Sequence, residues 1–172
     1  MNLSVTIDGR EESRRAFQTV AENIRDFREV WPEIHMYFLR ANVEHFESFG
    51  ARGGAQWQPL SESYAQWKAK KYPGKPILVA TERLKRSLSL AGQKGGDQVY
   101  EETALSLTMG TAVPYARYHQ RGTARMARRP VLQPTQRDID RMVSRLYRYV
   151  ERGARDAGFQ TTGRARNTPG AS

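Results

Sequence analysis

The amino-acid sequence predicts an α+β fold with a long N-terminal helical region, a small antiparallel sheet with a hairpin, a C-terminal amphipathic helix and a mobile C-terminal tail. Three observations predict this fold. An apolar seam near the N-terminus repeats every three or four residues, two alternating stretches follow later in the chain, and the last helix separates apolar from arginine side chains. The length of 172 residues suits one domain. We expect this α+β domain over residues 1–153 and a flexible basic tail over residues 154–172.

The N-terminal region alternates apolar and polar residues over Leu3–Ile7, which predicts a half-buried strand ending in a turn at Asp8-Gly9. A long apolar seam follows. It consists of Phe17, Val20, Ile24, Phe27, Trp31, Ile34 and Phe38. Because Pro32 interrupts the seam, we expect either two helices, over about 11–30 and 33–49, or one bent helix. The seam packs in the core or contacts another subunit.

Short elements are predicted in the middle of the chain. Ser61 can cap a helix that runs to about Lys70, and Thr81 can cap another over Glu82–Leu88. The stretches 98–102 and 105–109 alternate between two faces, which predicts a hairpin.

The last helix is predicted from Thr135, a suitable N-cap, to about Gly153. Its expected apolar face consists of Ile139, Met142, Val143, Leu146 and Val150. Its expected opposite face consists of Arg137, Arg141, Arg145, Arg148, Arg152 and Arg155. These arginines are either solvated and paired with acids of the same helix, such as Asp138, or they face an acidic partner or DNA.

The charge of the chain is concentrated in its C-terminal part. Residues 115–172 contain thirteen arginines, no lysine and four acids, a net charge of +9 out of +10 for the whole chain. Such asymmetry points to an acidic protein surface or to nucleic acid. An arginine-rich codon usage is the alternative explanation of this composition.

The inventory of reactive groups gives no catalytic or metal site. There is no cysteine, and no stretch is apolar enough to span a membrane. His35 and His45 lie ten residues apart and do not share a helix face as paired metal ligands do. The Gly74-Lys75 pair lacks the spacing of a phosphate-binding loop. We therefore expect no enzyme and no cofactor.

The loop before the last helix combines aromatic, amide and arginine side chains around Pro114 and Gly122. Its candidate interface residues are Tyr115, Tyr118, His119, Gln120, Arg121, Arg128 and Arg129. They either fill a small core beneath the loop or contact a neighbouring subunit, where Tyr and Arg are favoured.

Two blocks of the sequence resemble the Mu-like phage virion morphogenesis, or tail completion, family. The first includes Trp57-Gln-Pro-Leu-Ser61 and Thr81-Glu-Arg-Leu-Lys-Arg-Ser-Leu88, and the second is Tyr115-Ala-Arg-Tyr-His-Gln-Arg-Gly122 with Arg128-Arg-Pro-Val-Leu132. Glu82 departs from the family pattern, in which a glycine is usual. Arg121 also departs, at a position that is often apolar or aromatic.

The resemblance implies a structural protein of a tailed phage that acts through protein–protein contacts. We expect a homo-oligomeric ring, with a hexamer favoured over a dodecamer, that joins head and tail, terminates the tail or serves as a neck connector. The expected partners are neighbouring neck and tail proteins, with DNA possible in the channel and no membrane. The expected location is the virion neck or tail end, and the host cytoplasm during assembly. The alternatives are a non-sequence-specific nucleic-acid-binding protein that uses the arginine face, and a small metal-dependent nuclease, for which the basic half offers few carboxylates.

Overall fold

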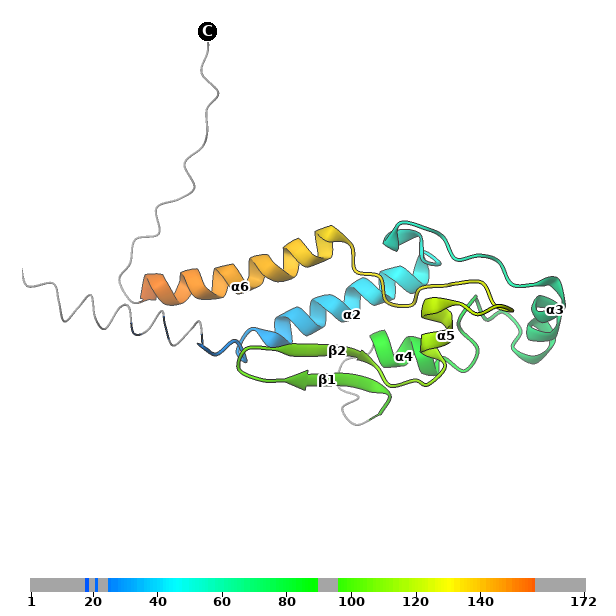
Figure 1. Cartoon of the computed structure of the whole chain (residues 1–172), viewed down its shortest axis with the longest axis horizontal. Coiled ribbons are helices and arrows are strands. Elements are labelled where there is room, and N and C mark those ends of the chain that lie inside the picture. Colours follow the sequence, from blue (N-terminus) through cyan, green and yellow to red (C-terminus); the bar gives the residue numbers. More distant parts are fainter. Residues whose placement is uncertain (1–17, 19–20, 22–24, 90–95, 157–172) are drawn as a thin grey trace, which may run out of the picture.

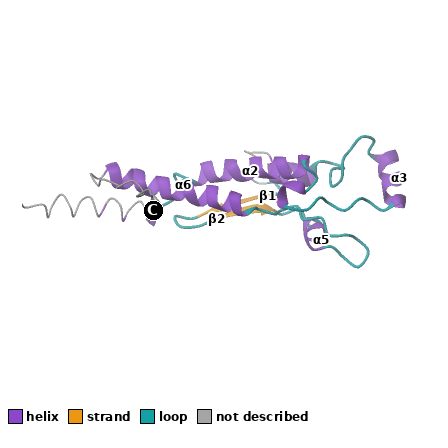
Figure 2. Cartoon of the chain, turned by 90° about the horizontal axis from the view of Figure 1, so that it is seen from above, coloured by secondary structure: helices purple, strands orange, loops and turns teal. Residues whose placement is uncertain are grey.

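The computed structural model describes residues 18, 21, 25–89 and 96–156, and confirms the α+β fold. The elements are α2 (Trp31–Glu47), the 3-10 helix η1 (Ala51–Gly53), α3 (Glu62–Lys71), α4 (Arg83–Ser89), β1 (Gln98–Glu102), β2 (Leu107–Thr111), α5 (Ala116–Arg121) and α6 (Gln136–Asp156). In Figure 1, α2 runs through the centre, with α6 along one side and the hairpin and α4 along the other. Figure 2 shows α3 at one end of the long axis.

Helix α2 begins at Trp31, so Pro32 lies in its first turn, where a proline costs no hydrogen bond. Residues 28–30 form a turn, and the first of the two predicted helices therefore does not reach residue 30. The backbone N–H of Phe27 instead donates to the carbonyl of Ala104 at 2.7 Å, which joins this turn to the hairpin. The predicted strand Leu3–Ile7 and the first three seam residues lie outside the described residues.

Helix α3 agrees with the sequence prediction to within a residue. Ser61 occupies its N-cap position, but its side chain makes no capping hydrogen bond. Helix α4 begins at Arg83, one residue later than predicted, because Glu82 has a φ of +64° and is not helical. The carbonyl of Glu82 accepts the first helical hydrogen bond, from the N–H of Arg86 at 2.8 Å.

The hairpin pairs β1 with β2 in antiparallel register, with Gln98 opposite Thr111 and Glu102 opposite Leu107. The second strand begins two residues later than predicted. The cause is a turn in which the Thr103 hydroxyl accepts the N–H of Ser106 at 2.9 Å. A shift by two residues keeps every side chain on its predicted face.

Helix α5 was not predicted, because its six residues are too few for a helical period to show. Pro114 precedes it, and Gly122 follows it with a φ of +75°. This order of proline before and glycine after a helix was the available indication in the sequence.

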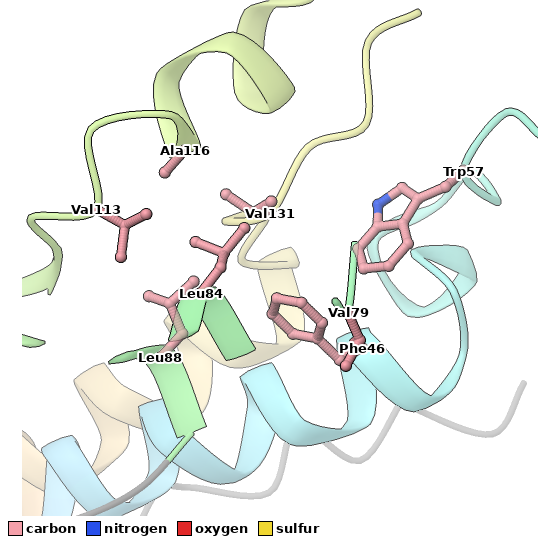
Figure 3. Close-up of a cluster of buried hydrophobic side chains, with 8 residues drawn as sticks. All are labelled: Phe46, Trp57, Val79, Leu84, Leu88, Val113, Ala116 and Val131. Atoms are coloured by element: carbon pink, nitrogen blue, oxygen red, sulfur yellow. The ribbon is translucent and has the colours of Figure 1, made fainter. Parts of the chain in front are cut away.

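Two core clusters share α2. The first cluster consists of Phe46, Trp57, Val79, Leu84, Leu88, Val113, Ala116 and Val131 (Figure 3). The second cluster is centred on Val30, Trp31 and Ile34, against which Leu107, Met109, Met142, Leu146 and Tyr149 pack. Apart from Phe46 of α2, every residue of the first cluster comes from residues 57–88 or 113–131. The two sequence blocks that carry the family resemblance therefore pack together into one core.

Candidate interaction surface

The segment after α5 is held against that helix by one amide. The Oε1 atom of Gln120 accepts the N–H groups of Val131 at 2.9 Å and Leu132 at 3.0 Å. Its Nε2 atom donates to the carbonyl of Leu132 at 2.8 Å. These bonds satisfy backbone groups that the extended segment leaves unpaired. Gln120 is therefore structural.

The same segment is tied to the first sequence block. The carbonyl of Pro130 accepts the indole N–H of Trp57 at 2.8 Å and lies 2.9 Å from Nε2 of His45. The guanidinium of Arg129 donates to the carbonyls of Gln58 and Pro59, each at 2.7 Å. Only 5% of Arg129 is exposed, so it too belongs to the interior of the monomer.

The remaining loop residues are accessible. The exposed fractions of Tyr115 and Tyr118 are 37% and 45%, and Arg121 and Arg128 are exposed. Tyr118 accepts a hydrogen bond from Arg117 at 2.7 Å, and Arg128 donates to the carbonyl of Gln120 at 3.2 Å. The internal reading of the loop therefore holds for Gln120 and Arg129, whereas contact with a neighbouring subunit stays a prediction for the exposed residues.

His119 lies between these two groups. It is half-buried, its ring meets that of Tyr115 edge to face at 6.0 Å, and its Nδ1 atom has no hydrogen-bond partner among the described residues. Burial, with a contribution from the nearby charge of Arg129, lowers the pKa of His119. Burial therefore disfavours the charged form of this ring, which lies beside a groove.

The groove encloses about 840 Å³ between α3, the start of α4 and the loop after α5. Tyr115, His119 and Arg129 line it, as do Leu78 and Glu82, two non-glycine residues with positive φ. Left-handed backbone in such residues is strained and concentrates at functional sites. The groove therefore combines accessible loop residues with local strain.

Helix α6 begins with a reciprocal cap. The Thr135 hydroxyl accepts the N–H of Asp138 at 3.2 Å, and the Asp138 carboxylate accepts the N–H of Thr135 at 2.8 Å. This confirms the predicted N-cap. The helix ends at Asp156, three residues beyond the predicted end.

One alternative made Asp138 a solvated partner of the helix arginines. The structure instead buries Asp138, which is 1% exposed. Its carboxylate accepts hydrogen bonds from Arg52 at 2.5 and 2.7 Å and from Tyr37 at 2.6 Å. The bonds from Arg52, then those from Tyr37 and Thr135, hold its pKa well below the ordinary value despite burial. The pair joins η1 to the start of α6. No sequence pattern links residues so far apart.

The predicted arginine face divides into two groups. Arg145 pairs with Glu33 and Arg152 with Glu29, each at 2.7 Å, and Arg141 lies over the ring of Tyr37. The alternative of pairing within the helix therefore does not hold for Arg145 or Arg152, because Glu33 lies on α2 and Glu29 just before it. The second group forms no ion pair within the described part of the chain. It consists of Arg137, Arg148 and Arg155.

The apolar face of α6 is rotated relative to its prediction. Met142, Leu146 and Tyr149 pack on the second core cluster. Ile139 and Val143, predicted to be buried, are 42% and 40% exposed, and Tyr147 beside them is 68% exposed. These three residues recur every four positions and form one stripe, which we name the α6 stripe. Periodicity indicated an apolar face but could not show which part of it the monomer covers.

The residues that the structure describes contain neither a membrane-spanning helix nor a candidate metal site. None of their helices combines the length and apolar character needed to cross a membrane. No three of their histidine and acidic side chains converge in a way that could hold a metal ion.

The comparisons with known proteins give one match. The model of the phage virion morphogenesis family matches residues 8–151, which include both core clusters, α5 and most of α6. Searches of curated proteins and of solved structures found no match. Because the match covers most of the sequence, the chain belongs to the phage virion morphogenesis family.

Proposed function

We propose that the chain is a tail completion or neck subunit that forms a homo-oligomeric ring, with a hexamer favoured over a dodecamer. Its family membership indicates a role in phage virion assembly that is structural rather than catalytic. The ring would lie at the neck or tail end of the virion, after assembly in the host cytoplasm. Its partners would be neighbouring neck and tail proteins, with DNA in the channel.

The main support for this proposal is the α6 stripe, which lies on the same helix as the unpaired Arg137, Arg148 and Arg155. Ile139, Val143 and Tyr147 expose apolar surface along two turns of a helix whose other side is already packed. A continuous apolar row bordered by charge is typical of a protein–protein contact. The exposed Tyr118 and Arg121 add residue types that are favoured in interfaces.

The test places a charge in the stripe. We expect Val143→Glu to prevent assembly, because an unpaired carboxylate would be buried at the contact. Ala55→Glu, exposed in the loop after η1 and outside α6, is the matched control and should assemble normally. Mass photometry and negative-stain microscopy, alone and with neck and tail proteins, report the outcome. A wild-type chain that stays monomeric with all of these partners contradicts the proposal.

A second candidate function is supported by the three unpaired arginines, Arg137, Arg148 and Arg155. They lie within a narrow arc of α6, suited to phosphate contacts without base readout. Affinity for duplex DNA would then fall steeply with salt, by a log–log slope of about −0.9 per phosphate contacted. Arg148→Glu should reduce this slope, and Arg121→Glu is the control. A filter-binding titration that shows no affinity at low salt removes this candidate.

A further inference from the structure

The groove described above carries positive charge that the described residues do not neutralise. Its lining includes four cations, Lys68, Arg83, Arg125 and Arg129, and one acid, Glu82. Arg83 pairs with Asp97 and Glu82 pairs with Lys75, each at 2.5 Å. The other three cations have no carboxylate partner within the described residues. An occupant with carboxylates would supply what the lining lacks.

Two of these unpaired cations are buried. Lys68 and Arg129 are each 5% exposed, and their nitrogen atoms donate to backbone carbonyls rather than to acids. Burial lowers the pKa of each, because it removes water from the charge and the bonded carbonyls are neutral. A buried cation with neutral partners is stabilised when an anion approaches, because the attraction between opposite charges is stronger where water is excluded. Arg125, exposed at the rim, adds attraction during approach.

The rest of the lining is largely apolar. Leu60, Leu78 and Met126 contribute aliphatic side chains, and Tyr64 and Tyr115 contribute rings. An occupant that matches the groove therefore presents apolar side chains next to carboxylates, in a segment thin enough to enter.

One segment outside the described residues has this composition. In residues 3–12 the apolar Leu3, Val5 and Ile7 alternate with polar residues, so an extended conformation would bring them to one face. The three acids Asp8, Glu11 and Glu12 follow, against one base. The other terminal segment, residues 157–172, contains two arginines and no acid, so its charge excludes it. The hairpin edge is also a poorer site, because Glu101 and Glu102 of β1 would repel the same acids.

We propose that residues 3–12 of one copy dock in the groove of a second copy, an inference that rests on the proposed ring and specifies how its subunits are joined. A second copy is favoured because the N-terminal end of α2, which follows residues 3–12 in the chain, lies at the end of the molecule opposite α3 (Figure 1). Helix α2 alone, at 17 residues, separates these ends by about 25 Å. A contact between two different surfaces of one chain is heterologous and closes into a ring when the rotation permits.

The absence of cysteine makes this contact directly testable by disulfide trapping in the full-length chain. Copies carrying Val5→Cys are mixed with copies carrying Ala127→Cys, at an exposed groove position, and oxidised. A disulfide-linked dimer of the two variants is the expected result. Thr108→Cys, exposed on the hairpin outside the groove, replaces Ala127→Cys in the control and should give little product.

The charge contribution is tested in the same assay. Arg125→Glu in the groove-bearing copy should reduce the trapped product by at least about tenfold, because like charges would then meet. Arg40→Glu, exposed on α2 and outside the groove, should leave the yield unchanged. The charge swap is completed by adding Glu11→Arg and Glu12→Arg to the copy that carries Val5→Cys. If this copy restores the yield of disulfide with the Arg125→Glu copy, the result supports a direct contact.

Three outcomes overturn the inference. They are trapping on Thr108→Cys instead, equal yields for Arg125→Glu and Arg40→Glu, and a disulfide that forms only within one chain carrying both Val5→Cys and Ala127→Cys. Mass photometry of the untrapped wild type separates this result from the proposed function. Rings without the predicted disulfide refute the groove contact alone. The disulfide without rings supports the groove contact and counts against the ring.

Discussion

The most constrained single residue in the structure is Asp138. It caps the first turn of α6 and accepts hydrogen bonds from Arg52 and Tyr37, on η1 and α2. A carboxylate at this point also interacts favourably with the positive end of the helix. Because three elements meet at one buried charge, loss of that charge affects their relative placement rather than one contact.

We expect Asp138→Asn to reduce stability at neutral pH by about 2–4 kcal/mol, because it leaves the partly buried Arg52 without its main counter-charge. Asp140→Asn is the matched control, since Asp140 is exposed and its carboxylate accepts a hydrogen bond from Gln136, not from an arginine. Urea unfolding of both variants measures the difference. Equal stabilities of the two variants would show that the Asp138 charge contributes nothing.

The same residue predicts a pH dependence. Its pKa in the folded chain lies below the ordinary value of 3.8, so the unfolded state binds its proton more readily. The stability that ionised Asp138 contributes is therefore complete above about pH 5 and is lost as the pH falls through about 4 and below. The wild type should lose stability over this range more steeply than Asp138→Asn, as thermal melts at a series of pH values will show. An equal loss of stability on acidification in the wild type and in Asp138→Asn would contradict this role of Asp138.

Glu82 is a second residue with a specific expectation. Its φ of +64° costs a non-glycine residue about 1–2 kcal/mol, whereas glycine adopts this backbone freely. This explains why the family pattern has glycine here. Glycine also adds about 0.4–1 kcal/mol of entropy to the unfolded chain, and the change removes the ion pair with Lys75. We therefore expect Glu82→Gly to stabilise the protein by at most about 1 kcal/mol.

The control for this change is Glu82→Ala, which removes the ion pair with Lys75 but keeps the strained backbone. Both side chains of that pair are exposed, so the loss should be under about 1 kcal/mol. Melting temperatures of the three proteins distinguish backbone from side-chain effects. A Glu82→Gly variant no more stable than Glu82→Ala would show that the strain is negligible.

At the scale of elements, local patterns predicted those parts of the fold that depend on neighbouring residues. Helix α3, the cap at Thr135 and the faces of the hairpin follow from spacing and side-chain chemistry within a few positions. Helix α5 was missed because it is shorter than two turns. The pairing of Arg52 with Asp138 was missed because 86 residues separate them. The exposure of Ile139 and Val143 depends on how α6 is rotated against α2, which only tertiary packing determines.

The candidate site shows the same division. The loop from Tyr115 to Arg129 was identified from its unusual mixture of residue types, which is a local property. Which of its members are internal was not predictable, because Gln120 and Arg129 satisfy carbonyls and N–H groups of segments that the sequence does not place beside them. The groove was missed altogether, since its lining comes from three separate parts of the chain.

The three hydrogen bonds by which Gln120 holds the segment after α5, which we call the Gln120 clamp, lead to a prediction at the scale of the loop. Gln120→Leu keeps similar bulk but leaves two N–H groups and one carbonyl of the following segment without partners. We expect a loss of about 2–4 kcal/mol in urea unfolding, since each unsatisfied buried group costs about 1–3 kcal/mol. Arg121→Ala, the exposed neighbour, should stay within about 0.5 kcal/mol of wild type. Similar stabilities of the two variants would show that water replaces the clamp.

At the scale of the whole molecule, α2 is the element that unites the two core clusters. It contributes Phe46 to the first and Trp31 and Ile34 to the second, at opposite ends of one rigid helix. The hairpin cannot provide this link by itself, because an isolated two-stranded sheet is only marginally stable. A substitution that destabilises either cluster should therefore destabilise the whole domain.

We accordingly expect a single unfolding transition, which tests the prediction of one domain over residues 1–153. Leu88→Ala in the first cluster and Ile34→Ala in the second should each cost about 2–4 kcal/mol, because both side chains are almost fully buried. Each variant should lower the midpoint of the same transition, measured by calorimetry with equal calorimetric and van't Hoff enthalpies. Two transitions, each lowered by only one of the variants, would mean that the clusters unfold as separate units and that α2 does not couple them.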